Sequence, residues 1–506
     1  MKNILYLSLS LATIAFTSCQ PEFDNPVDDP GFYDSGEADF SNFVAVGNSL
    51  TAGYADGALY LDGQQNSFPS ILATQFLHAG GGEFTQPLVN DNLGGLLANG
   101  QQITDNRRVI KISADGSRNP VVLEGTPTTD ITNVLDGPFN NMGVPGAKSY
   151  HLGAAGYGNI ANFPAAANPY FIRMASAPDA TVIGDAVAQN PTFFSLWIGN
   201  NDILSYATSG GVGVNQTGNL DPTTYGSNDI TDPNVFAKVY SDLLGALTAN
   251  DAKGVVCNIP NVTTIPYFTT VPYNPVPLDQ ATVNQLNQEL IGPLKQILTA
   301  FGAGDRVVLL SATQPNPVMI TDESLTNLEA QLNAALVASG IPPQQAALMA
   351  NLYGQARHAT PEDLVTLPTS SLIGTTQEGI PAPFNTVGVT YPLQDANILT
   401  PAEQTEVLTA QTAYNTTIKA LADQNGLAFV DVEALMNQLA EGGISFDGGT
   451  ITNVYATGGA FSLDGVHPSQ RGYAVIANAI IESINTTYSS NVPEVNPGAF
   501  PTIFVE

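Results

Sequence analysis

The stretch Phe43-Val44-Ala45-Val46-Gly47-Asn48-Ser49-Leu50 decides the fold class of this chain. Four consecutive apolar residues end at a glycine, which is typical of a strand buried on both faces of a parallel sheet. The pattern recurs at residues 193–198, 254–259, 306–310 and 427–432. Because helical patterns lie between such runs, the sequence predicts a three-layer α/β/α domain with a parallel central sheet.

Two helices toward the C-terminus are clearly marked in the sequence. The residues Thr400-Pro401-Ala402-Glu403 offer an N-cap, a proline in the first turn and a capping-box glutamate. This helix is expected to end at Gly426. A last helix is predicted to begin near Pro468, with an apolar stripe at Tyr473, Ile476, Ile480 and Ile484.

Two stretches look like insertions into this domain, which we place at residues 40–490, ahead of a C-terminal tail at 491–506. Residues 208–227 are rich in Gly, Asn and Thr and are expected to form a long loop. Residues 263–399 begin with several prolines and continue with two helical patterns and a stretch of little periodicity. The larger insertion is either a cap over a functional site or a decoration of the fold, and the sequence favours neither.

Composition excludes several classes of protein. The chain of 506 residues has 45 acidic and 14 basic side chains, and its net charge of −31 would repel the phosphates of a nucleic acid. Two cysteines exclude a disulfide scaffold and a cysteine-rich zinc site. No two of the four histidines are three or four residues apart, so neither a metal nor another cofactor is expected.

The first residues of the chain are predicted to be a targeting signal rather than part of the folded domain. Met1-Lys2-Asn3 precedes an apolar run at residues 4–16, which is too short to span a bilayer and is typical of a signal peptide. The run ends in Phe16-Thr17-Ser18-Cys19, which resembles a bacterial lipoprotein processing site except at its phenylalanine. The resemblance implies removal of residues 1–18 and lipidation of Cys19, and an ordinary secretory signal is the alternative.

The lipoprotein resemblance also implies a location. A lipid anchor would hold the protein at the bacterial outer membrane, facing the periplasm or the cell surface, without a transmembrane helix. Residues 19–39 are rich in Pro, Asp, Gly and Glu and are predicted to form a flexible acidic tether. With Cys19 lipidated, Cys257 would lack a disulfide partner, and its apolar surroundings predict an inert buried thiol.

Polar residues directly follow two of the predicted strands. Ser49 stands in a Gly-Asn-Ser turn after the first strand, at the edge where parallel sheets commonly bind ligands. Gly199-Asn200-Asn201-Asp202 follows the strand at 193–198, and an asparagine amide at that edge can donate to an oxyanion. Taken alone, each segment is as easily an ordinary turn.

A third candidate segment, Asp464-Gly465-Val466-His467-Pro468, lies just before the last helix. On a tight turn, the Asp464 carboxylate can bond to one imidazole nitrogen of His467 and leave the other nitrogen free as a base. A fourth segment, Asn141-Met142-Gly143-Val144-Pro145-Gly146-Ala147, is expected to be a loop. Within this loop, Gly146 could present its backbone N–H to a ligand.

In this order, the four segments resemble the motifs of the GDSL/SGNH hydrolase superfamily. The match covers Gly47-Asn48-Ser49-Leu50, Gly146, residues 199–202 and residues 464–467. The first block has Asn48 where the family usually has aspartate, and an asparagine is expected to keep the hydrogen bonds that support the turn. The resemblance does not extend to the large insertion.

The family resemblance implies a role for each matched residue. It implies Ser49 as the nucleophile, His467 as the general base and acid, and Asp464 as the residue that orients the imidazole. It implies an oxyanion hole formed by the N–H groups of Ser49 and Gly146 and the side chain of Asn201. It also implies a flavodoxin-like sheet, in agreement with the strand pattern.

The implied activity is hydrolysis of carboxylic esters. The substrate could be a lipid, a small acyl ester or an acetylated glycan, and the sequence does not separate them. A surface-anchored binding or interaction lipoprotein on an inactive hydrolase fold is the alternative, motivated by Asn48 and the long insertion. A metal-dependent hydrolase has no ligand spacing in its favour.

Overall fold

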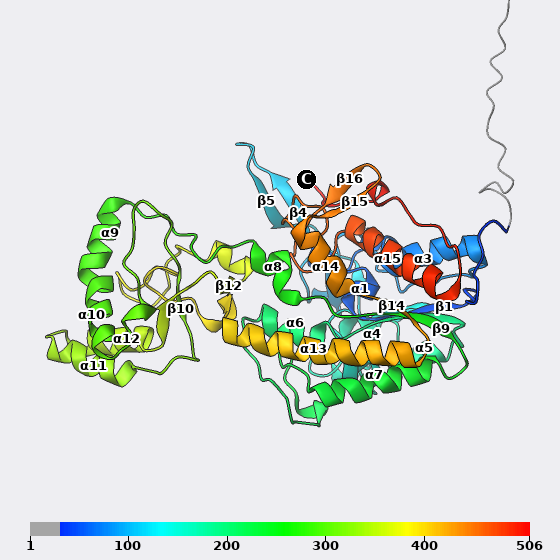
Figure 1. Cartoon of the computed structure of the whole chain (residues 1–506), viewed down its shortest axis with the longest axis horizontal. Helices are drawn as coiled ribbons and strands as arrows, with labels where there is room; N and C mark the ends of the chain where they lie inside the picture. Colours follow the sequence, from blue (N-terminus) through cyan, green and yellow to red (C-terminus); the bar gives the residue numbers. More distant parts are fainter. Residues whose placement is uncertain (1–30, 506) are drawn as a thin grey trace, which may run out of the picture.

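The computed structural model of the protein describes residues 31–505 (Figure 1). The predicted signal peptide at 1–18, the lipidation site Cys19 and the start of the tether lie outside these residues. Over the part that the structure describes, no helix has both the length and the apolar character needed to cross a membrane.

A five-stranded parallel sheet forms the centre of the larger part of the molecule, which we call the body. Its strands lie in the order β14-β9-β8-β1-β7, and every neighbouring pair is parallel. Counted along the chain and read from the other edge, this is the flavodoxin-like order 2-1-3-4-5. The predicted fold class is therefore confirmed. The strands are β1 Phe43–Gly47, β7 Asn141–Gly143, β8 Phe193–Trp197, β9 Lys253–Cys257 and β14 Ala428–Val430.

Helices cover both faces of this sheet (Figure 1). Val44 and Val46 of β1 belong to the apolar cluster that includes α7 (Pro233–Leu247) and α13 (Pro401–Gln424). Phe43 and Ala45 belong to the opposite cluster, with α3 (Phe68–Phe76) and α15 (Gln470–Tyr488). Since successive strand residues alternate between two buried faces, every residue of the strand must be apolar.

Shorter elements connect and border these layers. The short helices of the body are α1 Ser49–Ala52, α2 Leu61–Gln65, α4 Pro169–Ile172, α5 Val182–Val187, α6 Asn201–Thr208, α8 Pro266–Thr269 and α14 Val432–Glu441. The outlying strands are β2 Leu96–Ala98, β3 Gln101–Gln102, β4 Arg108–Ile112, β5 Arg118–Val122, β6 Thr129–Asp130, β15 Ile444–Phe446 and β16 Gly449–Ile451.

Residues 270–399, which we call the cap, project from one side of the body (Figure 1). Two apolar clusters made almost wholly of its own side chains give the cap a core of its own. The chain leaves the body after α8 and returns directly into α13. The cap contains α9 Gln280–Leu286, α10 Gly292–Ala300, α11 Glu329–Ala338, α12 Pro343–Tyr353, β10 Met319–Thr321, β11 Ala356–His358, β12 Leu364–Val365 and β13 Ile398–Leu399.

Two local predictions were wrong. No strand forms at residues 306–310, because Val307 and Leu310 are buried in the cap's core while the two residues between them are exposed. Asn141–Gly143, expected to be a loop, is the edge strand β7 and pairs with β1. In contrast, the buried setting predicted for Cys257 is confirmed, and burial raises the pKa of its thiol.

Candidate active site

Ser49 is the first residue of α1, directly after β1 and Asn48. The Asn48 side-chain oxygen accepts from the Leu50 N–H at 3.0 Å, which caps the helix. The Asn48 amide donates to the side-chain oxygen of Asn200 at 3.1 Å, which ties the ends of β1 and β8 together. Ser49 therefore sits at the carboxyl edge of the sheet on a turn fixed from both sides.

The structure brings Ser49, His467 and Asp464 into one series of hydrogen bonds. The Nε2 atom of His467 lies 2.9 Å from the Ser49 Oγ, although the two residues are 418 positions apart. The Nδ1 atom of His467 lies 2.8 Å from Asp464 Oδ2. A proton on Nδ1 would therefore leave Nε2 free to accept the serine proton.

Asp464 is held as a charged carboxylate. Burial alone would raise its pKa, but His467 and the surrounding hydrogen bonds outweigh burial and lower the pKa to about 2. The backbone N–H groups of Val466 and His467 and the Ser462 hydroxyl donate to Oδ1, and the Gly57 N–H donates to Oδ2. The charge that orients the imidazole is thus maintained across the pH range in which proteins are stable.

Asp56 connects the loop after α1 to the loop that carries Asp464. Its carboxylate accepts from the Leu463 N–H and the Tyr60 hydroxyl, both at 2.9 Å, and its own N–H donates to Ser462 Oγ at 2.9 Å. Burial raises the pKa of Asp56 to about 6. Sequence reasoning missed this support, because no local pattern indicates a contact spanning 406 positions.

Two of the three predicted oxyanion donors, Gly146 and Asn201, lie on segments that are tied together. The Asn201 amide donates to the Ala147 carbonyl at 2.9 Å. Asp202, completely buried at the start of α6, accepts from the Ser149 N–H at 2.8 Å and the Ser149 hydroxyl at 2.7 Å. Burial raises the pKa of Asp202, and the hydrogen bonds from Ser149, which favour the charged carboxylate, do not fully offset this effect. The link fixes the loop that carries Gly146 against the helix that carries Asn201.

Two backbone donors remain available at the predicted hole. Gly146 has φ +80°, a conformation that other residues rarely adopt, so the turn requires glycine. Among residues 31–505, no hydrogen-bond acceptor is found for the backbone N–H of Ser49 or of Gly146. A free backbone N–H is what an oxyanion hole would require of each of these predicted donors.

An apolar pocket opens at Ser49. About 790 Å³ there is free of protein atoms, a space that includes the opening to solvent. Besides Ser49, Asn200, Asn201 and His467, nearly all of its lining is apolar and includes Trp197, Val262, Met436, Phe461 and Ile476. The Trp197 N–H donates to the Asn258 carbonyl at 3.1 Å, so this ring is held in the wall of the pocket.

A wider groove passes between the body and the cap and reaches the other side of His467. The body contributes Tyr54, Arg108 and Tyr267, while the cap contributes apolar residues and prolines, among them Pro272, Val276 and Leu367. The insertion therefore borders the site, and a molecule bound at Ser49 would extend into a space that the cap partly encloses.

Comparisons with known proteins add similar folds at very low identity. No family model matches the chain, and no curated protein matches it. An acetyl-xylooligosaccharide esterase of Geobacillus stearothermophilus, solved as a variant, is 10% identical with a TM-score of 0.31, over 89% of this chain and 96% of the esterase. An α/β hydrolase from the metagenome of Lake Arreo is 9% identical with a TM-score of 0.30, over 89% of this chain and 97% of that enzyme. The function proposed below therefore rests on the geometry of the site.

Proposed function

We propose that this protein is a serine hydrolase of carboxylic esters, of the GDSL/SGNH type. The observation that carries the proposal is the unbroken series Asp464–His467–Ser49 beside an apolar pocket. A serine in contact with a base, which is itself oriented by a buried carboxylate, is the arrangement of an activated nucleophile. A hydrolase fold that serves only for binding would have no need to keep both contacts of this series.

The proposed reaction has two steps. His467 Nε2 takes the proton from Ser49 Oγ as this oxygen attacks the ester carbonyl, and the same nitrogen then protonates the departing alcohol. Water attacks the resulting acyl-serine and gives a proton to His467, which passes it to Ser49 Oγ as the carboxylic acid leaves, so that the serine hydroxyl and the neutral imidazole are restored. The N–H groups of Ser49 and Gly146 and the Asn201 amide would hold the carbonyl oxygen in both steps.

The two spaces beside Ser49 suggest how an ester binds. An acyl chain fits the apolar pocket, while the larger alcohol part fits the groove under the cap. Each methylene buried in such a pocket contributes about 0.8 kcal/mol, or about fourfold in kcat/KM. We therefore propose esters of medium-length or longer acyl chains as substrates, in preference to acetyl esters such as acetylated glycans.

A series of p-nitrophenyl esters with acyl chains of increasing length tests both parts of the proposal. We expect kcat/KM to rise by about fourfold per methylene until the pocket is filled. Ser49→Ala should lower kcat on the order of 10⁴-fold or more, and it should abolish labelling by a fluorophosphonate. Ser227→Ala, which changes an exposed serine, is the control and should keep both.

The outcomes separate the alternatives. Full activity in Ser49→Ala would remove this residue from its role. A chain that is folded but inert toward every ester and toward the fluorophosphonate would favour a binding lipoprotein. Fastest turnover of the acetyl ester would transfer the preference to acetylated glycans.

The location stays a proposal drawn from the N-terminal sequence. We propose a lipid anchor on Cys19 that holds the hydrolase at the outer membrane, with the predicted acidic tether connecting the anchor to the body. Metabolic labelling of expressing bacteria with a radioactive fatty acid should mark the wild type. Label retained in Cys19→Ser would contradict the anchor.

A further inference from the structure

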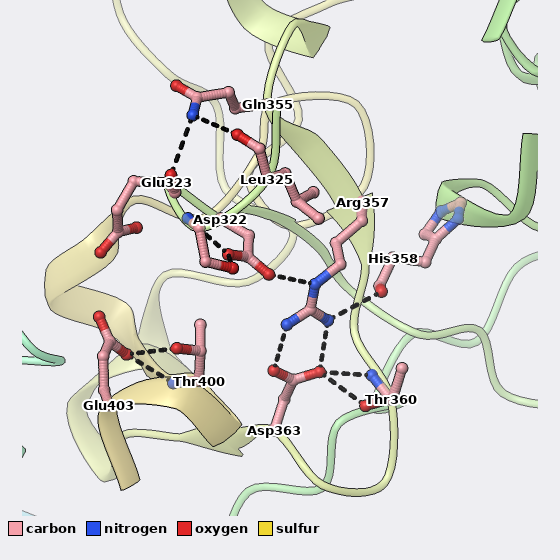
Figure 2. Close-up of polar contacts among 11 residues, drawn as sticks. Asp322, Glu323, Leu325, Gln355, Arg357, His358, Thr360, Asp363, Thr400 and Glu403 are labelled. Carbon is pink, nitrogen blue, oxygen red and sulfur yellow. Dashed lines mark hydrogen bonds and ion pairs between the residues drawn. The ribbon is translucent and has the colours of Figure 1, made fainter. Parts of the chain in front are cut away.

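Three carboxylates meet where the cap joins the body. Glu323 follows β10 in the cap, Asp395 begins the short turn Asp395–Asn397 on the way back, and Glu403 lies in the first turn of α13. One oxygen of each lies within 4.8 Å of the other two. Figure 2 shows Glu323 and Glu403 facing each other from separate segments of the chain. We call these three residues the acidic cluster.

One oxygen of Glu403 is buried without a partner. The capping box uses only Oε2, which accepts from the Thr400 N–H at 2.6 Å and the Thr400 hydroxyl at 2.8 Å. Glu403 is only 5% exposed, and no hydrogen-bond partner for its Oε1 is found among residues 31–505. This oxygen points toward Glu323 (Figure 2). A buried acceptor left unpaired is costly and indicates a missing ligand.

The neighbouring guanidinium does not neutralise the cluster. Arg357 donates to Asp322 at 2.6 Å and to both oxygens of Asp363 at 2.6 and 2.7 Å (Figure 2). A single positive charge is thus already shared by two carboxylates outside the cluster. Burial and the neighbouring acidic groups raise the pKa of Glu403 to about 8 and that of Asp395 to about 6. A bound cation would relieve this repulsion.

The backbone around the cluster is fixed. The Gln355 amide donates to the carbonyls of Glu323 and Leu325, at 3.1 and 2.8 Å, and so holds the loop that carries Glu323. On the body side, a Cβ atom at Gly211 would lie 2.1 Å from Glu403 Oε1, so glycine is needed beside that oxygen. The ligand oxygens are therefore presented by segments that are already held in place.

We propose that the acidic cluster binds a calcium ion that fastens the cap to the body. Ca²⁺ takes several carboxylate and water oxygens at about 2.3–2.6 Å in a flexible geometry. Mg²⁺ demands a near-ideal octahedron and is usually held by only one or two carboxylates. Three carboxylate oxygens that all lie within 4.8 Å of one another therefore suit calcium, and water would complete the coordination.

Calcium titration of the full chain tests this site. By calorimetry, we expect one calcium ion to bind per chain, and 1 mM CaCl₂ should raise Tm by roughly 2–4 °C relative to EGTA. Glu323→Gln should abolish both the binding and the shift without unfolding the chain, because the Gln355 amide holds this loop through the Glu323 backbone carbonyl, which the substitution keeps. Glu378→Gln, at an exposed glutamate of the cap, should leave both unchanged.

Three outcomes would overturn the proposal. Absence of calcium binding in the wild type would do so, as would unchanged binding in both Glu323→Gln and Asp395→Asn. Tighter binding of Mg²⁺ than of Ca²⁺ would reject the assignment of the ion. Fluorophosphonate labelling of Ser49 tests the hydrolase separately, so either proposal can fail without the other.

Discussion

Two largely buried carboxylates in this molecule, Asp464 and Glu403, have pKa values shifted in opposite directions. Asp464 in the body accepts five hydrogen bonds, two of them from His467, and its pKa falls to about 2. Within residues 31–505, Glu403 at the junction with the cap accepts hydrogen bonds only from Thr400 and faces two other carboxylates, and its pKa rises to about 8. Burial acts in the same direction on both groups, so the neighbours decide whether the carboxylate keeps its charge.

The first prediction, which has the largest expected effect, removes the negative charge of Asp464. Asp464→Asn keeps the shape of the side chain but no longer fixes the His467 tautomer or stabilises the imidazolium. We expect kcat on p-nitrophenyl esters to fall on the order of 10⁴-fold, with unchanged far-UV circular dichroism. Asp242→Asn, at an exposed ion pair on α7, is the matched control. A loss of less than tenfold would show that the carboxylate does not orient the base.

The second prediction concerns Asp202, a third buried carboxylate, whose pKa is raised by burial although Ser149 donates two hydrogen bonds to it. Asp202→Asn retains one acceptor where Ser149 needs two, so the loop that carries Gly146 should shift. We expect kcat to fall roughly tenfold, less than the 10²–10³-fold of a deleted oxyanion donor, with little change in KM. Ser149→Ala removes one of the same bonds and should act in the same direction. An effect confined to KM would contradict the positioning role.

The third prediction concerns Glu403 and is expected to have the smallest effect on activity. Because the folded-state pKa of Glu403, about 8, lies above its ordinary value, the unfolded chain loses this proton first. In EGTA, the wild type should therefore lose stability as pH rises from about 4.5 to 8, and Asp395 adds to the loss. Glu403→Gln still accepts from Thr400, so it should exceed the wild type in Tm at pH 8 and match it near pH 4. Parallel Tm profiles for the two proteins would refute the argument.

The sheet could be predicted from sequence where its strands are long and buried on both sides. Residues 43–46 are four consecutive apolar residues and residues 193–197 are apolar apart from Ser195, and both segments form strands of the sheet. The edge strand β7 has only three residues and the sequence Asn-Met-Gly, so its composition resembles a turn. The strand predicted at 306–310 does not form for a different reason: the cap's core buries only Val307 and Leu310 of this apolar run and leaves the two residues between them exposed.

The candidate site likewise has residues that the sequence predicts and supporting contacts that it does not. Ser49, Asp464 and His467 are visible in the sequence because short turns set their local geometry. The contacts that hold them, such as Asp56 with Leu463, join segments about 400 positions apart and leave no local pattern. The acidic cluster was also hidden, since Glu403 is fully explained within its own helix as a capping residue. A long-range contact of this kind becomes visible only when the chain is folded.

The junction between the cap and the body depends on two glycines, which have no side chain. Gly210 and Gly211 both have positive φ, and a methyl group there would collide with the Asp395 carbonyl or with Glu403 Oε1, each at 2.1 Å. A side chain at either position would push the segment that returns from the cap away from the end of α6. The smallest residues in the loop thereby set how closely a domain of 130 residues can rest on its neighbour.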